Sequence, residues 1–299
     1  MSKYSKIYFI GVGGIGMSAI ARYYKFKGYP VAGYDRTPSD LTHALEKEGI
    51  DVHYNDDPDY IPKDVASTLV IYTPAIPADL KELVYVKEHG YTLVKRSRML
   101  GELAEGQTCL AVAGTHGKTT TSTLVAHILT ESGKGCSAFL GGISKNYDTN
   151  LLTSHTPTIV AEADEFDRSF LQLHPAIAAI TAMDADHLDI YGTLEEYRKA
   201  FKAFASQVSR TLIVKLGLDI TAEDTNARIL HYSYDNPDAD YHAANPRPDE
   251  VGHYIFDLVY PGGVIGNIRV GIPGWVNVEN SVAAAAVCLC HGVAPEAIK

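Results

Sequence analysis

The chain has 299 residues, of which 46% are hydrophobic and 21% are charged. This length and composition favour an ordinary folded protein with ample core and two domains. Its 26 basic and 36 acidic residues give a formal net charge of −10, and the longest basic run is Lys95-Arg96-Ser97-Arg98. We therefore expect no nucleic acid partner, because binding to phosphate backbones requires basic surface.

Cysteine usage and the N-terminus bear on location. The cysteines form neither a Cys-x-x-Cys pair nor a zinc-binding spacing; they are Cys109, Cys136, Cys288 and Cys290. Reduced, buried thiols fit a cytoplasmic location. The first residues lead into a short strand rather than a signal peptide, and no apolar stretch approaches the roughly 18 residues that cross a membrane. We therefore expect a cytoplasmic protein with no membrane partner.

The first third of the chain alternates between strand and helix patterns. Strands are expected at residues 6–10, 30–34, 69–72 and 92–95, and helices at residues 17–27, 41–48, 80–88 and 98–103. Alternation at this spacing predicts a parallel, doubly wound sheet of the Rossmann-like α/β class. We expect this first domain to cover residues 1–105.

A glycine-rich turn follows the first strand. Gly11, Gly13 and Gly16 satisfy the G-x-G-x-x-G pattern, and Asp35 lies 19 residues beyond Gly16 at the end of the second strand. This fingerprint is typical of dinucleotide binding, in which the acidic residue holds a ribose hydroxyl. Its physics requires only that a diphosphate approaches the backbone at Gly13 and Gly14 and the following helix N-terminus. NAD and a UDP-sugar both remain open as ligands, and a close helix–strand contact without a ligand is the alternative.

A second glycine-rich loop follows the apolar run at residues 109–112 and precedes a helical pattern at residues 119–131. It reads Ala113-Gly114-Thr115-His116-Gly117-Lys118-Thr119-Thr120, which is a phosphate-binding loop between a strand and a helix. Backbone N–H groups can cradle nucleotide phosphates, while Lys118 reaches the β- and γ-phosphates and Thr119 holds Mg²⁺. The usual first glycine of the motif falls on Val112, so the loop is a variant, and a turn without a ligand is the alternative. The pattern favours a site for a nucleoside triphosphate.

The phosphate-binding loop opens a second expected domain, residues 106–299. Further strands are expected at residues 136–140, 158–161, 176–182 and 211–214, and a helix at residues 195–208. Continuous apolar runs favour strands buried on both faces of a parallel sheet, as in an α/β domain of the P-loop NTPase type. Short alternating strands at residues 254–260 and 264–270 predict an antiparallel extension, and a last helix starts near residue 278. The chain ends where another element is expected to begin, so we expect a truncated protein.

Acidic residues and a histidine follow two of these strands. Glu162 directly follows the strand at residues 158–161, where a metal-binding carboxylate is expected to face the phosphates. His187 follows Asp186 beyond the strand at residues 176–182. Ligands of open α/β sheets bind beyond the carboxyl ends of the strands, so both clusters are expected on the rim that carries the phosphate-binding loop. A neutral His187 could bind a second Mg²⁺, although oxygen ligands are commoner for that ion; a solvated acidic loop is the alternative.

Two phosphate-binding loops in one chain restrict the function. A nicotinamide-dependent dehydrogenase would use only the first loop, and a simple ATPase would use only the second. An ATP-driven ligase that acts on a nucleotide-linked substrate uses both. A non-catalytic nucleotide-binding module is a further alternative.

With these motifs placed, the chain resembles the Mur ligase family. The resemblance is carried by the segments Gly11-Val12-Gly13-Gly14-Ile15-Gly16-Met17-Ser18, Gly114-Thr115-His116-Gly117-Lys118-Thr119-Thr120, Glu162-Ala163-Asp164-Glu165, Asp186-His187-Leu188-Asp189 and Asn277-Val278-Glu279-Asn280. It implies an ATP- and Mg²⁺-dependent ligase of peptidoglycan precursor synthesis, which joins L-alanine to the carboxylate of UDP-N-acetylmuramate through an acyl phosphate. A relative that attaches a preformed tripeptide to the same sugar nucleotide is the alternative within the family.

The resemblance also implies roles for individual residues. The expected catalytic residues are Lys118, Glu162 and His187, and the expected metal ligands are Thr119, Glu162 and His187. The expected ATP-binding residues are Gly114, Thr115, His116, Gly117, Lys118, Thr119, Thr120, Asn277 and Asn280. The expected UDP-sugar-binding residues are Gly11, Gly13, Gly14, Ile15, Gly16, Met17, Ser18 and Asp35.

Two departures from the family pattern bear on these roles. Val276 stands where the family usually has a histidine near the adenine, and Trp275 is the candidate to replace that contact by stacking. The family's C-terminal domain, which closes over ATP and helps to bind the amino acid, is expected to be absent. We therefore expect the 299 residues alone to bind ligands weakly and to turn over little.

Overall fold

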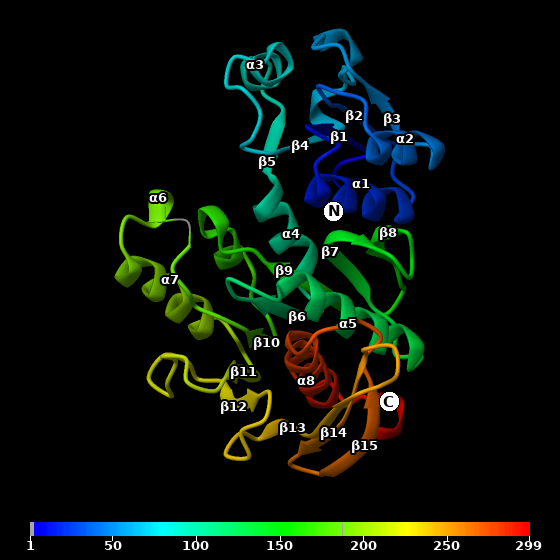
Figure 1. Ribbon diagram of the computed structural model, residues 1–299. Coiled ribbons are helices and arrows are strands. Elements are labelled where there is room, and N and C mark those ends of the chain that lie inside the picture. The colour runs from blue at the N-terminus through cyan, green and yellow to red at the C-terminus, as the bar shows by residue number, and fades with distance from the viewer. Residues whose placement is uncertain (1–2, 187) are drawn as a thin grey trace. The chain divides into compact units, whose positions relative to one another are not determined.

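The computed structural model describes residues 3–186 and 188–299 (Figure 1). The chain divides into two compact units, Met1–Leu103 with Phe139–Thr153, and Ala104–Ala138 with Ser154–Lys299. The division after Leu103 lies close to the expected boundary. Residues 139–153 group with the first unit, although they lie within the stretch expected to form the second domain.

The first unit contains a five-stranded sheet in the order β3-β2-β1-β4-β5, and every strand pair in it is parallel. Its elements are β1 (Lys6–Ile10), α1 (Ile15–Phe26), β2 (Val31–Tyr34), α2 (Asp40–Lys47), β3 (Asp51–His53), β4 (Thr68–Tyr72), α3 (Lys81–Glu88), β5 (Thr92–Lys95) and α4 (Arg96–Ala104), with short 3₁₀ helices at Pro58–Tyr60 and Val65–Ser67. This strand order is that of doubly wound nucleotide-binding folds. The Rossmann-like expectation is therefore confirmed.

The central position of β1 in this sheet explains the burial of its side chains. Tyr8, Phe9 and Ile10 are each 0% exposed, because helices cover both faces of a doubly wound sheet and every side chain of a central strand is then enclosed. Strand β3 was not expected from the sequence. It has three residues, all exposed or half-buried, and such a short edge strand leaves no apolar run in the sequence.

The larger sheet has ten strands in the order β15-β14-β13-β12-β11-β10-β6-β9-β7-β8. The strands are β6 (Thr108–Ala113), β7 (Ser137–Ser144), β8 (Thr149–Leu152), β9 (Thr158–Ala163), β10 (Ile177–Ile180), β11 (Thr211–Lys215), β12 (Arg228–Ser233), β13 (Tyr241–Pro248), β14 (Tyr254–Tyr260) and β15 (Gly263–Arg269). The helices of this part of the chain are α5 (Lys118–Glu131), α6 (Leu188–Tyr191), α7 (Leu194–Ser206) and α8 (Trp275–Cys290), with 3₁₀ helices at Phe166–Gln172 and Pro295–Ala297.

The pairing within this sheet confirms a parallel core with an antiparallel extension. Strands β6, β9, β10, β11 and β12 pair in parallel, whereas β13–β14 and β14–β15 pair antiparallel. Because parallel strands share a direction, the carboxyl ends of β6, β9 and β10 lie at the same edge, where the phosphate-binding loop leaves β6. Within residues 3–186 and 188–299, no helix is both long enough and apolar enough to cross a membrane.

Candidate functional site

The phosphate-binding loop between β6 and α5 is shaped by glycines that no other residue could replace without strain. Gly114 has φ +137° and Gly117 has φ +81°, a region that residues with a Cβ rarely adopt. A Cβ at Gly114 would lie 2.2 Å from Thr181 Oγ1 and 2.7 Å from the Ala182 amide nitrogen. The loop therefore lies directly against the chain that leaves β10.

Hydrogen bonds hold the loop in this position. The Thr181 hydroxyl lies 3.1 Å from the Ala113 carbonyl oxygen and 2.5 Å from that of His116, and the Thr115 N–H donates to the Ala182 carbonyl. The Thr115 hydroxyl donates to the Asp184 carbonyl oxygen at 3.0 Å. Since these contacts turn carbonyl groups toward β10, they leave the N-terminus of α5 to present its N–H groups, as anion binding at a helix N-terminus requires.

Lys118 is the first residue of α5, and its ammonium group folds back over the loop. Lys118 Nζ donates to the Gly114 carbonyl oxygen at 2.7 Å and to Glu165 Oε1 at 2.9 Å, and it lies 2.8 Å from Glu165 Oε2. The Glu165 side chain is only 1% exposed. The Glu165 carboxylate thus pairs with the Lys118 ammonium group, which is expected to contact phosphate oxygens when a nucleotide is bound. Glu165 was not among the expected site residues, although it lies in the acidic run that drew attention to Glu162.

Glu162 lies next to the first turn of α5. The Ser122 hydroxyl lies 3.2 Å from both Glu162 Oε1 and the Thr119 carbonyl oxygen. The Ser122 hydroxyl therefore connects Glu162 with the backbone of Thr119, and the Glu162 carboxylate and the Thr119 hydroxyl remain the expected oxygen ligands. Mg²⁺ is usually held by one or two carboxylates with substrate phosphates and water completing its shell, so this donor set suits that ion. Among the described residues, no group of three His, Cys, Asp or Glu side chains gathers to hold a metal.

The remaining polar residues of the loop differ in exposure. His116 is 73% exposed and its Nε2 lies 3.8 Å from Asp184 Oδ2, while Thr120 is half-buried in α5. The Thr115 and Tyr197 hydroxyls lie 3.0 Å apart, and burial raises the pKa of Tyr197 to about 12, so this phenol stays protonated at neutral pH. His187 lies outside the residues that the structure describes.

Asn280 reaches the phosphate-binding loop from α8. It is 8% exposed; its Oδ1 accepts from the Thr121 hydroxyl at 3.4 Å, and its Nδ2 donates to Asn277 Oδ1 at 3.2 Å. A Cβ at Gly117 would lie 2.6 Å from Asn280 Oδ1. Of the two expected adenine-binding residues, Asn280 therefore lies against the loop, whereas Asn277 donates to the Pro273 carbonyl at the start of α8.

Trp275 occupies an exposed position at the N-terminal end of α8. Its side chain is 55% exposed, and its ring stands edge-on to that of Tyr234, with 5.6 Å between the ring centroids. This contact fixes one edge of the indole ring while a large part of its surface stays accessible. An exposed, oriented aromatic ring of this kind can stack on a planar ligand.

The glycine loop of the first unit begins with Gly11, whose φ is +88°. The N–H groups of Gly11 and Val12 both donate to the Tyr34 carbonyl oxygen. The N–H of Gly13 donates to Asp35 Oδ2 at 2.7 Å. One oxygen of Asp35 thus holds the loop itself, and a ribose hydroxyl would have to share this carboxylate with the loop.

In the first turn of α1, backbone groups rather than side chains are available to contact a ligand. Met17 and Ser18 are 1% and 0% exposed, and the Ser18 hydroxyl donates to the Ile15 carbonyl oxygen at 2.9 Å. Gly14 is exposed, and the nearest atom to a Cβ placed there would be 3.6 Å away. Open space above Gly14 and the N–H groups of the first turn, which have no partner within a helix, together suit a diphosphate.

Arg96, at the start of α4, adds a positive charge to this turn. A Cβ at Gly16 would lie 2.6 Å from Arg96 Nη1, so the guanidinium group packs directly against the glycine. Arg96 was not among the expected site residues, although it belongs to the longest basic run of the chain. A guanidinium group beside a helix N-terminus strengthens anion binding.

Comparison with known proteins shows which family the chain is similar to. Residues 6–108 match the Mur ligase family, catalytic domain, and residues 112–288 match the Mur ligase middle domain. The UDP-N-acetylmuramate–L-alanine ligases of Porphyromonas gingivalis strain W83 and Phocaeicola vulgatus are 49% and 50% identical to this chain, each over 98% of it. The chain spans 66% and 65% of the length of these two relatives.

A solved structure extends the comparison to the fold. The UDP-N-acetylmuramate–alanine ligase of Thermotoga maritima is 28% identical and superposes with a TM-score of 0.84, covering 98% of this chain and 67% of its own. The two matched family regions together cover most of this chain. The chain belongs to the Mur ligase family.

Proposed function

We propose that this chain carries the nucleotide-binding part of a cytoplasmic, ATP-dependent ligase that joins L-alanine to the carboxylate of UDP-N-acetylmuramate during peptidoglycan precursor synthesis. The observation that carries the proposal is the presence of two separate glycine-rich turns in one chain, each leading into a helix N-terminus, at α1 and at α5. The names of the half-identical relatives supply the substrate pair. Four free cysteines support the cytoplasmic location.

The proposed chemistry activates a carboxylate, which is by itself a poor acyl donor. The carboxylate oxygen attacks the γ-phosphorus of ATP, and the bond to the β,γ-bridging oxygen breaks, giving an acyl phosphate and ADP. The amine of L-alanine then attacks the acyl carbon, inorganic phosphate leaves, and the nitrogen loses a proton to give the amide. Lys118 stabilises the charge that the transferring phosphoryl group carries in the transition state.

Metal binding belongs to the same proposal. Thr119 and Glu162 are the proposed ligands of one Mg²⁺ ion, and the resemblance assigns His187 to a second. When bound, Mg²⁺ neutralises charge on the phosphate oxygens. The Ser122 hydroxyl, through its contact with Glu162 Oε1, orients this carboxylate in the absence of the ion.

The same proposal extends to the groups that contact the adenine of ATP and the diphosphate of the UDP-sugar. Asn280 lies against the loop at Gly117 and is the proposed neighbour of the nucleotide, with Asn277 beside it. Trp275 is proposed to stack on the adenine ring in place of the family's histidine. In the first unit, the proposed diphosphate ligands are the backbone N–H groups of residues 15–17, supported by Arg96, because the Gly14 and Ser18 N–H groups already donate to the carbonyl oxygens of Gly11 and Gly14.

Two matched substitutions test the assignment by separating the two sites. Lys118→Met should abolish binding of ATP, measured by isothermal titration, and leave binding of UDP-N-acetylmuramate intact. Gly14→Leu should do the reverse, because φ at Gly14 is −66° and the fold has room for a side chain that would then fill the diphosphate space. Loss of both affinities in either variant, or competition between the two ligands, would contradict two independent sites.

A dehydrogenase is tested in the same titration. NADH should not displace UDP-N-acetylmuramate at equal concentration if the first unit binds a UDP-sugar. Little turnover is expected from the 299 residues alone, but any release of ADP in the activity assay should require both UDP-N-acetylmuramate and L-alanine. ADP release that is indifferent to the sugar nucleotide would overturn the proposed reaction.

A further inference from the structure

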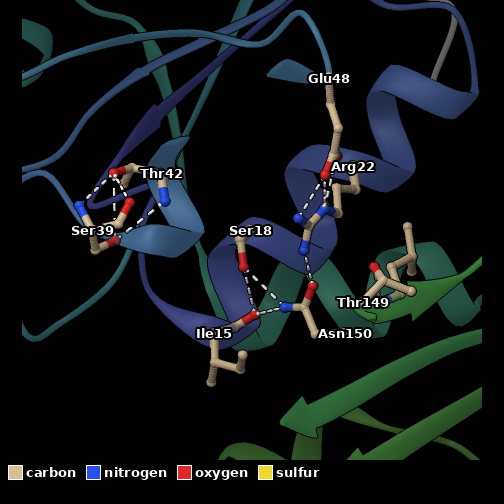
Figure 2. A network of polar contacts seen from close by, with 9 residues as sticks. Ile15, Ser18, Arg22, Ser39, Thr42, Glu48, Thr149 and Asn150 are labelled. Carbon is tan, nitrogen blue, oxygen red and sulfur yellow. Dashed lines mark hydrogen bonds and ion pairs between the residues drawn. The ribbon is translucent and has the colours of Figure 1, made fainter. Parts of the chain in front are cut away.

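A buried asparagine lies behind the glycine loop of the first unit. Asn150, in β8, is 0% exposed, and both ends of its amide are engaged (Figure 2). Its Nδ2 donates to the Ile15 carbonyl oxygen at 2.5 Å and to the Ser18 hydroxyl oxygen at 2.9 Å. Its Oδ1 accepts from Nη1 of Arg22. A buried polar side chain must find partners, because an unpaired amide in the interior is costly.

Arg22 connects this asparagine to a carboxylate. The Arg22 side chain is 8% exposed, and its guanidinium group pairs with Glu48, with Nη2 2.7 Å from Oε1 and Nε 2.8 Å from Oε2. The bidentate pair fixes the plane of the guanidinium group. Figure 2 shows the resulting order of groups, from the carboxylate of Glu48 through Arg22 and Asn150 to the carbonyl of Ile15.

This series of hydrogen bonds ends at one particular peptide unit. The carbonyl of Ile15 belongs to the same peptide unit as the N–H of Gly16, which lies in the first turn of α1, where N–H groups have no partner within the helix. Hydrogen bonds in series polarise one another. Donation from Asn150, itself polarised by the Arg22 charge, therefore makes the N–H of Gly16 a stronger donor.

The same contacts also restrict a flexible turn. Gly14 and Gly16 flank Ile15, and glycines lose more backbone freedom on ordering than other residues. Asn150 fixes the carbonyl between them and the hydroxyl of Ser18 one turn later. If the turn is already ordered before a ligand arrives, binding causes no further loss of its backbone entropy.

We propose that Asn150 is a positioning residue for the diphosphate of the UDP-sugar. It acts through the Ile15 carbonyl and the Ser18 hydroxyl, and it orients and polarises the first turn of α1 without touching the ligand. This inference rests on the proposed function of the first unit. Asn150 lies more than a hundred residues after the glycine loop, and nothing in the sequence around it indicates such a role.

Two substitutions separate donation from packing. Asn150→Ala removes the whole amide. Asn150→Asp keeps the shape and an acceptor for Arg22 but removes the donor to Ile15. Asn146→Ala, on the exposed turn of the same hairpin, is the matched control. Thermal unfolding of each variant checks that the chain is folded before binding is measured.

The probes are UDP and uridine, titrated into the 299-residue chain, with ATP as the probe of the second unit. We expect both Asn150 variants to bind UDP roughly three- to tenfold more weakly, as for the loss of one hydrogen bond, and to bind uridine and ATP as the unsubstituted chain does. The Asn146 variant should match the unsubstituted chain with all three. A general loosening of the fold would weaken UDP and uridine alike.

The outcomes distinguish this inference from the proposed function. If the unsubstituted chain binds UDP and both Asn150 variants bind it equally well, Asn150 has no positioning role and the proposed function stands. Equal weakening of UDP and uridine likewise overturns the inference, because the diphosphate is then not the group affected. If the unsubstituted chain does not bind UDP, the proposed function of the first unit is wrong and the inference falls with it.

Discussion

Removing the ammonium group of Lys118 should destabilise the second unit as well as remove the proposed partner of the ATP phosphates. The Glu165 carboxylate is 1% exposed, and Lys118 Nζ lies within 3 Å of both of its oxygens. In Lys118→Met the carboxylate keeps its burial and loses its counter-charge. Breaking a buried pair by removing one partner typically costs about 3–5 kcal/mol. Because Lys118 itself is 17% exposed and water can reach part of the pair, we expect about 3 kcal/mol.

A second substitution should recover most of this loss. In the double variant Lys118→Met, Glu165→Gln, the buried group is a neutral amide of nearly the same shape, so only an imperfectly paired polar group remains. The remaining loss of folding stability in the double variant should be about 1 kcal/mol. The double variant should therefore be about 2 kcal/mol more stable than Lys118→Met while binding ATP no better.

Equilibrium unfolding in urea at pH 8 measures these differences, with Lys199→Met as a control for loss of an exposed lysine. Lys199 is 59% exposed and pairs with Glu195 and Glu196 on the surface of α7, so its loss should cost well under 1 kcal/mol. A stability loss in Lys118→Met no larger than in Lys199→Met would refute the reasoning. So would a double variant no more stable than the single one.

Three further predictions concern other residues. Burial raises the pKa of Glu82 from 4.5 to about 7; the folded chain therefore holds a proton between these pH values that the unfolded chain has lost, and stability falls as the pH rises through this window. Glu82→Gln should remove about 3 kcal/mol of that fall between pH 4.5 and 8, measured by urea unfolding across the range. Gly114→Ala should cost about 2 kcal/mol or more from its φ of +137° and its 2.2 Å contact, whereas Gly28→Ala, with a positive φ but open space, should cost about 1 kcal/mol in thermal unfolding. Asp35→Asn keeps an acceptor for the Gly13 N–H and should bind UDP within about threefold of the unsubstituted chain; a much larger loss in titration would show that the carboxylate charge itself holds the ligand.

Much of the fold could be predicted because its strands are continuous apolar runs. Strands β1, β6 and β10 are buried along nearly their whole length, and burial on both faces leaves an unbroken run in the sequence. Strand β13 could not be predicted in this way. It contains Asn245, Pro246 and Pro248, its last four residues are exposed, and its register with β14 shifts at Ala244, so pairing rather than burial holds it.

The candidate sites could be predicted only in part, for a related reason. A turn with positive φ favours glycine, so Gly11, Gly114 and Gly117 mark both loops directly in the sequence. Contacts across long sequence separations leave no such mark. Glu165 and Arg96 stand in charged runs that the sequence made visible, but nothing in their spacing indicates that one pairs with Lys118 and the other packs on Gly16.

The two asparagines behind the loops show why such residues are needed. Each loop ends at a helix N-terminus whose N–H groups must point at a ligand, yet the glycines that permit the turn also leave it flexible. In each unit an asparagine from a distant segment lies against the turn: Asn150 donates to the Ile15 carbonyl of α1, and Asn280 lies against Gly117 at the N-terminus of α5. An asparagine suits this position because it can donate and accept at once without adding charge. The glycine motif therefore makes each turn possible, and the side-chain amide of a distant asparagine lies against it.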